Sequence, residues 1–202
     1  MIQVDRKGQN SILLFGGANQ QIPASLMEQA CRDLVPGDWL VLQNEINLTP
    51  ELIRKGHAEG LKICLNPSPM TPQILSCPLE LVTLFMLNEI EGAELAELPQ
   101  EAPPEDIADR LQARFPQASI CLTLGSRGAL FAQPGHPLLR QDAIPVKAVD
   151  TTAAGDTFTG YLLAALSEGQ SPRQALDLAT RAAAITVTRH GAMDAIPTRA
   201  EL

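Results

Sequence analysis

Residues 150–160 read Asp150-Thr151-Thr152-Ala153-Ala154-Gly155-Asp156-Thr157-Phe158-Thr159-Gly160. A β-like segment precedes them at 143–149, and an amphipathic helix is expected after them, with apolar side chains at helical spacing from Phe158 onward. Because Ala153, Ala154 and Gly155 have small side chains or none, the N–H groups at the start of this helix stay uncovered. The positive end of a helix with open N–H groups is suited to binding an anion.

Asp156 lies beside this opening. A carboxylate repels an anion, so its presence suggests that it collects a proton there. Phosphoryl transfer to an alcohol needs this combination of donors for the transferred group and a base for the attacking hydroxyl. The alternative is a carboxylate in the first turn of a helix, which stabilises the helix by on the order of a few tenths of a kcal/mol. The pattern alone does not decide between the two.

The rest of the chain alternates between strand and helix patterns. Strands are expected at 39–43, 62–66, 81–87, 120–124 and 128–132. Helices are expected at 23–34, 49–59, 89–97, 105–115, 155–168 and 172–188, the second of them capped by Thr49-Pro50-Glu51. Short strands alternating with helices predict the α/β fold class, with a mostly parallel sheet and helices on both of its faces.

The first residues depart from this alternation. Strand patterns at 1–5 and 11–15 enclose a polar turn at 6–10, which predicts a hairpin. A two-stranded unit is marginal by itself, so partner strands are expected upstream or on another chain. The predicted division is a partial β-hairpin domain at 1–19 and an α/β domain at 20–202.

Composition excludes several classes of partner. The 202 residues are 45% hydrophobic and have a formal net charge of −8, with 15 Lys and Arg against 23 Asp and Glu. A core of ordinary size is expected, and nucleic acid or an anionic membrane surface is not an expected partner. No leader pattern and no spanning segment is recognisable, which favours a cytoplasmic location.

The cysteines are scattered, without a C-x-x-C pair or a histidine at zinc spacing: Cys31, Cys64, Cys77 and Cys121. Reduced thiols are favoured over a metal site or a disulfide framework.

Taken together, these motifs resemble the ribokinase-like family of sugar kinases, and within it the ribokinases, from about residue 2 to about residue 197. The run at 150–158 is similar to the family signature. The resemblance implies that Ala153, Ala154 and Gly155 donate N–H groups to the transferred phosphoryl group. It implies that Asp156 is the base that takes the proton from the primary hydroxyl of the sugar. The implied reaction converts D-ribose and ATP to ribose 5-phosphate and ADP.

The resemblance also assigns residues to Mg²⁺ and the phosphates. Asn88-Glu89-Ile90-Glu91 is similar to the family's Asn-x-x-Glu motif, which implies Asn88 at the phosphates and Glu91 at the waters around Mg²⁺. By itself the same stretch is a helix start, with Asn88 as the N-cap and Glu91 three residues on, as in a capping box.

Two further segments match nucleotide and sugar positions. The family's nucleotide-edge turn falls on Thr123, Gly125, Ser126 and Gly128, although this stretch is also an ordinary hairpin turn. Glu45 occupies the place of a carboxylate that faces the sugar.

A cation site is implied by the loops at 150–152 and 186–195. The residues that resemble it are Asp150, Thr152, Thr186, Arg189 and Gly191, which would hold a monovalent cation, usually K⁺, largely through backbone carbonyls. The ribokinases have Ser where this chain has Ala195, so one hydroxyl of the pattern is missing.

The front of the family pattern has no counterpart here, over about its first hundred residues. The hairpin at 1–19 would then be a remnant of the family's β lid, through which a homodimer could form. Fructokinase, adenosine kinase and 2-keto-3-deoxygluconate kinase remain alternatives, as does a non-catalytic remnant that binds nucleotide or a partner kinase subunit. A dinucleotide-dependent dehydrogenase is disfavoured, because no strand is followed by G-x-G-x-x-G.

Overall fold

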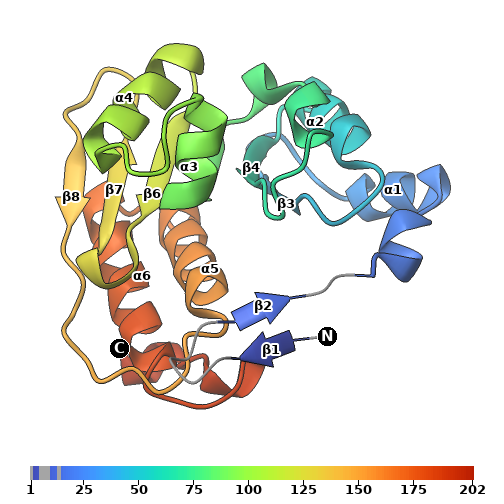
Figure 1. The fold of residues 1–202 in the computed structure, drawn as a ribbon. Helices are drawn as coiled ribbons and strands as arrows, with labels where there is room; N and C mark the ends of the chain where they lie inside the picture. The colour runs from blue at the N-terminus through green and yellow to red at the C-terminus, as the bar shows by residue number, and fades with distance from the viewer. Residues whose placement is uncertain (1, 5–9, 13–14) are drawn as a thin grey trace. The chain divides into compact units, whose positions relative to one another are not determined.

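The computed structural model describes residues 2–4, 10–12 and 15–202, and Figure 1 shows their helices and strands. They belong to two compact units. The first unit holds the described part of Met1–Phe15 together with Thr123–Ala129 and Leu139–Leu202. The second unit holds Gly16–Leu122 and Leu130–Leu138.

Six strands pair in the order β3-β4-β5-β6-β7-β8. Their bounds are β3 Trp39–Gln43, β4 Lys62–Asn66, β5 Leu84–Asn88, β6 Ser119–Thr123, β7 Ala129–Ala132 and β8 Leu139–Gln141. The strands β3, β4 and β5 are parallel, with Val41 opposite Cys64 and Cys64 opposite Leu84. The predicted α/β class is confirmed.

Burial along the strands follows their place in the sheet. A parallel strand between two others is covered on both faces, so its sequence is a continuous apolar run. Ile63, Cys64 and Leu65 of β4 are fully buried, and residues 84–87 of β5 are at most 2% exposed. β3 is at the end of the strand order, and Val41 on this strand is 51% exposed.

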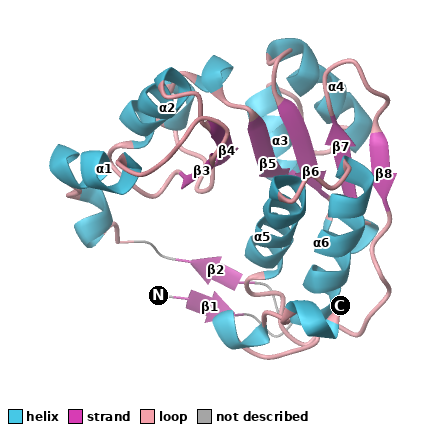
Figure 2. Cartoon of the chain, turned by 180° about the vertical axis from the view of Figure 1, so that it is seen from behind, coloured by secondary structure: helices cyan, strands magenta, loops and turns pink. Residues whose placement is uncertain are grey.

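The helices are α1 Ala24–Cys31, α2 Thr49–Ala58, α3 Glu89–Ala96, α4 Pro104–Arg114, α5 Ala154–Ser167 and α6 Pro172–Thr186. In the second unit α2 packs on β3 and β4, and α3 packs on β5 and α4. In the first unit α5 and α6 lie side by side, as both Figure 1 and Figure 2 show. Each predicted helix is present, and its first and last residues differ from the expected ones by at most three positions.

The cap predicted at Thr49 is wrong. Thr49 is the first residue of α2, and no side chain caps the preceding Leu48. The Thr49 hydroxyl instead donates to the backbone oxygen of Ile46 at 3.2 Å, which ties the helix to the turn before it. Pro50 suits the first turn of the helix, where a missing N–H costs nothing.

The β-like segment predicted at 143–149 is not a strand. The strand of this region is β8, which ends at Gln141 and which the sequence pattern did not indicate. Pro145 has no N–H to donate to a neighbouring strand. Ile144, Val146 and Val149 are 39%, 44% and 47% exposed, so they are not buried in the way that residues of an inner strand are.

At the front, β1 Ile2–Val4 pairs antiparallel with β2 Asn10–Ile12, with Ile2 opposite Ile12. The two expected strands are present in part, and residues 6–9 of the expected turn and 1, 5, 13 and 14 of the expected strands lie outside the described part of the chain. The division at residue 19 and the lid assignment stay predictions. No helix in the described ranges is long and apolar enough to cross a membrane.

Candidate active site

The first turn of α5 consists of Ala154, Gly155 and Asp156. The preceding N-cap residue, Ala153, has φ 60° and ψ 8°, a left-handed conformation that residues with a side chain rarely adopt. No side chain caps this helix, whereas α3 and α6 each begin with a complete capping box. The N–H groups of a first turn have no partner inside their helix. The N–H of Ala154 donates to the backbone oxygen of Thr151 at 3.3 Å, a long bond that an anion could replace, and Gly155 and the exposed Asp156 lie in the same turn.

Asp150 holds the loop before α5 in place. One of its carboxylate oxygens accepts from the N–H of Thr152 at 2.9 Å, and the other accepts from the N–H of Gly191 at 3.1 Å. The hydroxyl and N–H of Thr152, with the N–H of Gly191, lower the pKa of Asp150 to about 2. The N–H of Val149 also donates to the backbone oxygen of Val187 at 2.7 Å. The segments at 149–152 and 187–191 are thus bound together by hydrogen bonds.

The predicted nucleotide-edge turn is a tight turn between β6 and β7. The N–H of Leu124 donates to the backbone oxygen of Gly128 at 2.8 Å, and a short 3₁₀ helix spans Gly125–Arg127. Gly128 has φ 94°, and a Cβ there would lie 1.9 Å from the backbone oxygen of Gln141. Only glycine fits this position, because the chain after β8 passes directly against it.

A cavity of about 510 Å³ in the first unit connects this turn with the start of α5. Thr123, Gly125, Ser126 and Gly128 line it together with Ala154 and Gly155. The structure therefore brings together two motifs that lie about 30 residues apart in the sequence. The volume is in the range of small-molecule sites, roughly 300–1,000 Å³.

Most of the remaining lining is apolar and was missed by the sequence reasoning. It comes from the 143–148 segment and from facing residues of α5 and α6, including Ile144, Val146, Phe158, Ala183 and Ala184. The partly exposed apolar side chains of Ile144 and Val146 are explained by this cavity. Thr180 also lines it, is only 6% exposed, and its hydroxyl has no hydrogen-bond partner among the described residues. The sequence signal that could have indicated this part of the lining is Thr180 itself, a polar residue on the buried side of the alanine-rich helix α6.

Asn88 and Glu91 lie in the second unit, at the carboxyl end of β5. They form a complete capping box: the N–H of Glu91 donates to the Asn88 side chain at 2.9 Å, and the N–H of Asn88 donates to the Glu91 carboxylate at 3.0 Å. The helix-start interpretation is thus realised. Burial raises the pKa of the Glu91 carboxyl, and hydrogen bonds from Asn88 and Ser68 oppose that rise.

Glu45 is exposed in the turn after β3, also in the second unit. Its backbone oxygen accepts from the side chain of Gln20 at 2.8 Å. Because β3 and β5 are parallel, Glu45 and Glu91 follow strands that end at the same edge of the sheet. Ligands of open α/β sheets bind at that edge.

The residues expected near the cations can be tested for fit. Mg²⁺ takes few protein ligands and keeps several waters, so the single half-buried carboxylate of Glu91 fits a contact through water. For K⁺, several oxygens already accept hydrogen bonds: Asp150 as described, Thr186 from the N–H of Arg189, and Val187 from Val149 and Asp150. Ala195 is fully buried and offers no hydroxyl. In the described ranges no three His, Cys, Asp or Glu side chains form a metal-binding group.

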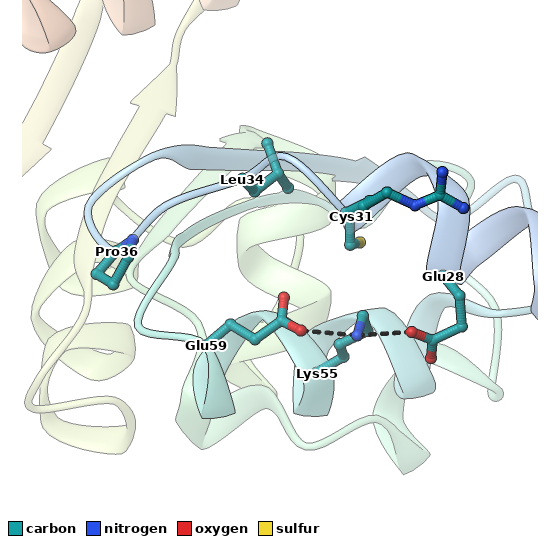
Figure 3. A pocket seen from close by; sticks show the side chains of 7 residues that line it. Glu28, Cys31, Leu34, Pro36, Lys55 and Glu59 are labelled. Carbon is teal, nitrogen blue, oxygen red and sulfur yellow. Dashed lines mark hydrogen bonds and ion pairs between the residues drawn. The ribbon is translucent and has the colours of Figure 1, made fainter.

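A second cavity, of about 550 Å³, lies between α1 and α2 in the second unit. Figure 3 shows Lys55 held between Glu28 and Glu59, at 2.9 and 2.7 Å. These hydrogen bonds raise the pKa of Lys55. None of the predicted site residues lines this cavity, and its lysine already has two carboxylate partners.

The geometry defines a class of protein: an α/β protein with a cavity at the uncapped start of a helix, where an anion could bind. Comparison with protein families identifies the family within this class. The model of the pfkB family of carbohydrate kinases matches residues 1–199. The chain belongs to the pfkB family of carbohydrate kinases.

Individual relatives agree with this assignment. The ribokinase of Haemophilus influenzae is 35% identical over 209 residues, covering 99% of this chain and 66% of the relative. The ribokinase structure from Thermotoga maritima has a TM-score of 0.81 at 32% identity, with 99% of this chain and 66% of that one covered. The Arabidopsis thaliana ribokinase complexed with ribose and ATP gives 0.83 at 29%, covering 98% and 65%. The chain thus spans slightly less than two thirds of the length of these relatives.

Proposed function

We propose that this chain is the nucleotide-binding and catalytic portion of an ATP-dependent carbohydrate kinase, and that its sugar is D-ribose. One observation carries the proposal: a single cavity joins the glycine turn at 123–128 to the uncapped start of α5, which also carries Asp156. A relative of similar fold binds ribose and ATP. The apolar slot between the 143–148 segment and α6 suits a planar base, and the N–H groups at the other end suit phosphate.

In this reaction Asp156 accepts the proton from the primary hydroxyl of the sugar. The sugar oxygen forms a bond to the γ-phosphorus of ATP as the bond from that phosphorus to the ADP oxygen breaks. The N–H groups of Ala154 and Gly155 stabilise the charge on the transferred group. Mg²⁺, when bound, neutralises charge on the phosphates, and Glu91 would orient its waters while Asn88 contacts the phosphates. Glu45 would accept a hydrogen bond from a sugar hydroxyl.

Several oxygens near the proposed K⁺ site already accept N–H groups, among them the backbone oxygens of Thr186 and Val187. The 150–152 and 186–191 loops would hold K⁺ through carbonyl oxygens that remain, beside the start of α5. A homodimer through the strands β1 and β2, and a cytoplasmic location, also belong to the proposal.

A binding remnant without catalysis is the second candidate, because the chain spans less than two thirds of its relatives. The two candidates differ in turnover and agree on nucleotide binding. The presence of Asp156 in the same helix turn as the proposed anion-binding N–H groups favours the kinase.

The test is the Asp156→Asn variant, assayed with ribose and MgATP in a form of the protein that turns over the sugar. An alcohol ionises far above neutral pH, so loss of the base lowers kcat by roughly 10²- to 10⁴-fold. Nucleotide affinity should stay the same or improve, since a negative charge near the phosphates is removed. Melting temperature measured on the same preparation provides the control. A variant that is slightly less stable and fully active would show that Asp156 serves only the helix.

A further inference from the structure

Two buried hydroxyl groups join α5 to α6 next to the proposed site. Thr157 is 3% exposed and Thr186 is fully buried. Their Oγ1 atoms are 3.2 Å apart, and Thr186 Oγ1 is also 3.1 Å from the backbone oxygen of Ala182. Thr157 directly follows Asp156 in α5, and Thr186 is the last residue of α6.

The direction of these hydrogen bonds follows from counting protons. A hydroxyl has one proton to donate, and a carbonyl oxygen can only accept. Thr186 must therefore donate to Ala182, and the bond between the two side chains must run from the Thr157 hydroxyl to Thr186 Oγ1. The three groups form a chain, and Thr186 is its shared member.

Local bonds also restrain the first turn of α5: the N–H of Ala154 donates to the backbone oxygen of Thr151 at 3.3 Å, and the Thr159 hydroxyl donates to the backbone oxygen of Gly155 at 2.8 Å. Its N-cap residue, Ala153, is in a left-handed conformation and no side chain caps the helix. The N–H of Thr157 donates to the backbone oxygen of Ala153 at 2.9 Å, which is the first bond within the helix. Strained conformations persist only where the surroundings hold them. The hydroxyl bond to α6 is such a restraint, and it acts on the residue beside the proposed base.

We infer that the Thr157–Thr186 hydroxyl pair positions the first turn of α5 against the end of α6, and so sets the N–H groups and Asp156 toward the transferred phosphoryl group. This inference rests on the function proposed above. Both threonines act through the turn and contact neither substrate.

Valine has the shape of threonine without the hydroxyl, so Thr157→Val, Thr186→Val and the double variant remove the bond in three ways. Thr186→Val leaves the Thr157 hydroxyl buried without an acceptor, so it should be the least stable of the three. The double variant leaves no unpaired hydroxyl and should regain part of that stability. Thr157→Ser keeps the bond. Thr49→Val is the matched control, since it removes a buried, hydrogen-bonded hydroxyl from the other unit.

The readout is the ratio of the Kd for ADP to the Kd for a non-hydrolysable ATP analogue, which isolates the contribution of the third phosphate. We expect this ratio to fall roughly 3- to 10-fold in all three valine variants, including the double variant that recovers stability. Thr157→Ser and Thr49→Val should leave it unchanged. A merely structural role predicts that both affinities change by the same factor, or not at all, and either result would overturn the inference.

Amide hydrogen exchange in the ligand-free chain separates failure of this inference from failure of the proposed function. The Thr157 N–H should exchange about 3- to 10-fold faster in Thr186→Val, and no faster in Thr49→Val. An unchanged rate would overturn the inference even in a protein that binds nucleotide. If the unaltered chain bound neither ADP nor the analogue, the proposed function would fail, and the exchange rate would still decide whether the hydroxyl pair holds the turn.

Discussion

Asp150 shows how a single carboxylate shapes the loop before the proposed site. Both of its oxygens accept backbone N–H groups, one from its own loop and one from Gly191, 41 positions away. These bonds are stronger to the charged carboxylate than to the neutral acid, which is why its pKa is lowered to about 2 from the ordinary 3.8. Its role in organising the loop does not require a bound cation.

This lowered pKa predicts a pH dependence of stability. A carboxyl whose folded-state pKa is lowered stabilises the protein above its unfolded pKa, and the benefit is lost as pH falls through the folded pKa. Asp150→Asn should therefore be less stable than the unaltered chain above about pH 4, with a difference that closes between about pH 4 and pH 2. Urea unfolding at a series of pH values measures it. A difference that stays constant down to pH 2 would contradict the assignment.

Glu91 has two roles that a pair of substitutions can separate. Glutamine can replace glutamate in a capping box, whereas alanine cannot. Glu91→Gln should keep the melting temperature and raise the Mg²⁺ concentration needed for half-maximal binding of an ATP analogue. Glu91→Ala should also raise that Mg²⁺ concentration, and it should lose about 0.5–2 kcal/mol of stability with the cap. If Glu91→Gln binds with unaltered Mg²⁺ dependence, Glu91 is a helix cap alone.

Among the elements, the turn between β6 and β7 is the most constrained by packing. Gly128 combines a positive φ with a backbone oxygen 1.9 Å from the position of a Cβ. Gly128→Ala should lower the free energy of unfolding by at least about 3 kcal/mol, because backbone rather than a side chain must move.

Gly160 provides the control for this substitution. It lies inside α5, where a Cβ would meet nothing within 4 Å. Gly160→Ala should stabilise the protein by about 0.5–1 kcal/mol through helix propensity. Urea unfolding of both variants tests the pair, and a Gly128→Ala variant as stable as the unaltered chain would show that the turn is not held by β8.

Strands with an apolar centre between polar turns were predicted well from the sequence. The bounds of β3 and β4 match those expected, because Trp39–Gln43 and Lys62–Asn66 are apolar runs between polar turns. The 143–149 segment was wrongly predicted as a strand, since its β-branched apolar residues, Ile144 and Val146, line a cavity instead of pairing in the sheet. Thr180 and the apolar wall of α6 were missed, because only packing brings that helix to the cavity.

Among the proposed site residues too, some could be predicted from local sequence and others depend on how distant segments pack. Asp156 and the open N–H groups of α5 could be anticipated, because small residues before a helix leave it uncapped. The meeting of that helix start with the turn at 123–128 could be expected only from the family resemblance, since the pairing of distant segments is not written in local sequence. For Asn88 and Glu91, local pattern and family resemblance pointed to different roles, and the structure realises the local one.

For the molecule as a whole, the proposed kinase function requires that the first-unit cavity is the nucleotide site. The chain spans about two thirds of the length of its relatives, so nucleotide binding tests the account more directly than turnover does. The cavity offers a substitution that fills it: Ala184→Leu keeps a good helix former and places a larger side chain among the lining residues. Glu28→Gln, in the second cavity, is the control.

The measurement is a calorimetric titration of the 202-residue chain and these two variants with a non-hydrolysable ATP analogue and Mg²⁺. If the cavity is the nucleotide site, the unaltered chain and Glu28→Gln bind the analogue at or below millimolar concentration. Ala184→Leu lowers the affinity about tenfold or more, because the added side chain occupies the space of the ligand. Circular dichroism of each sample shows that it is folded. A folded chain that binds no nucleotide at millimolar concentration, or one whose binding Ala184→Leu leaves unchanged, would contradict the assignment of this cavity.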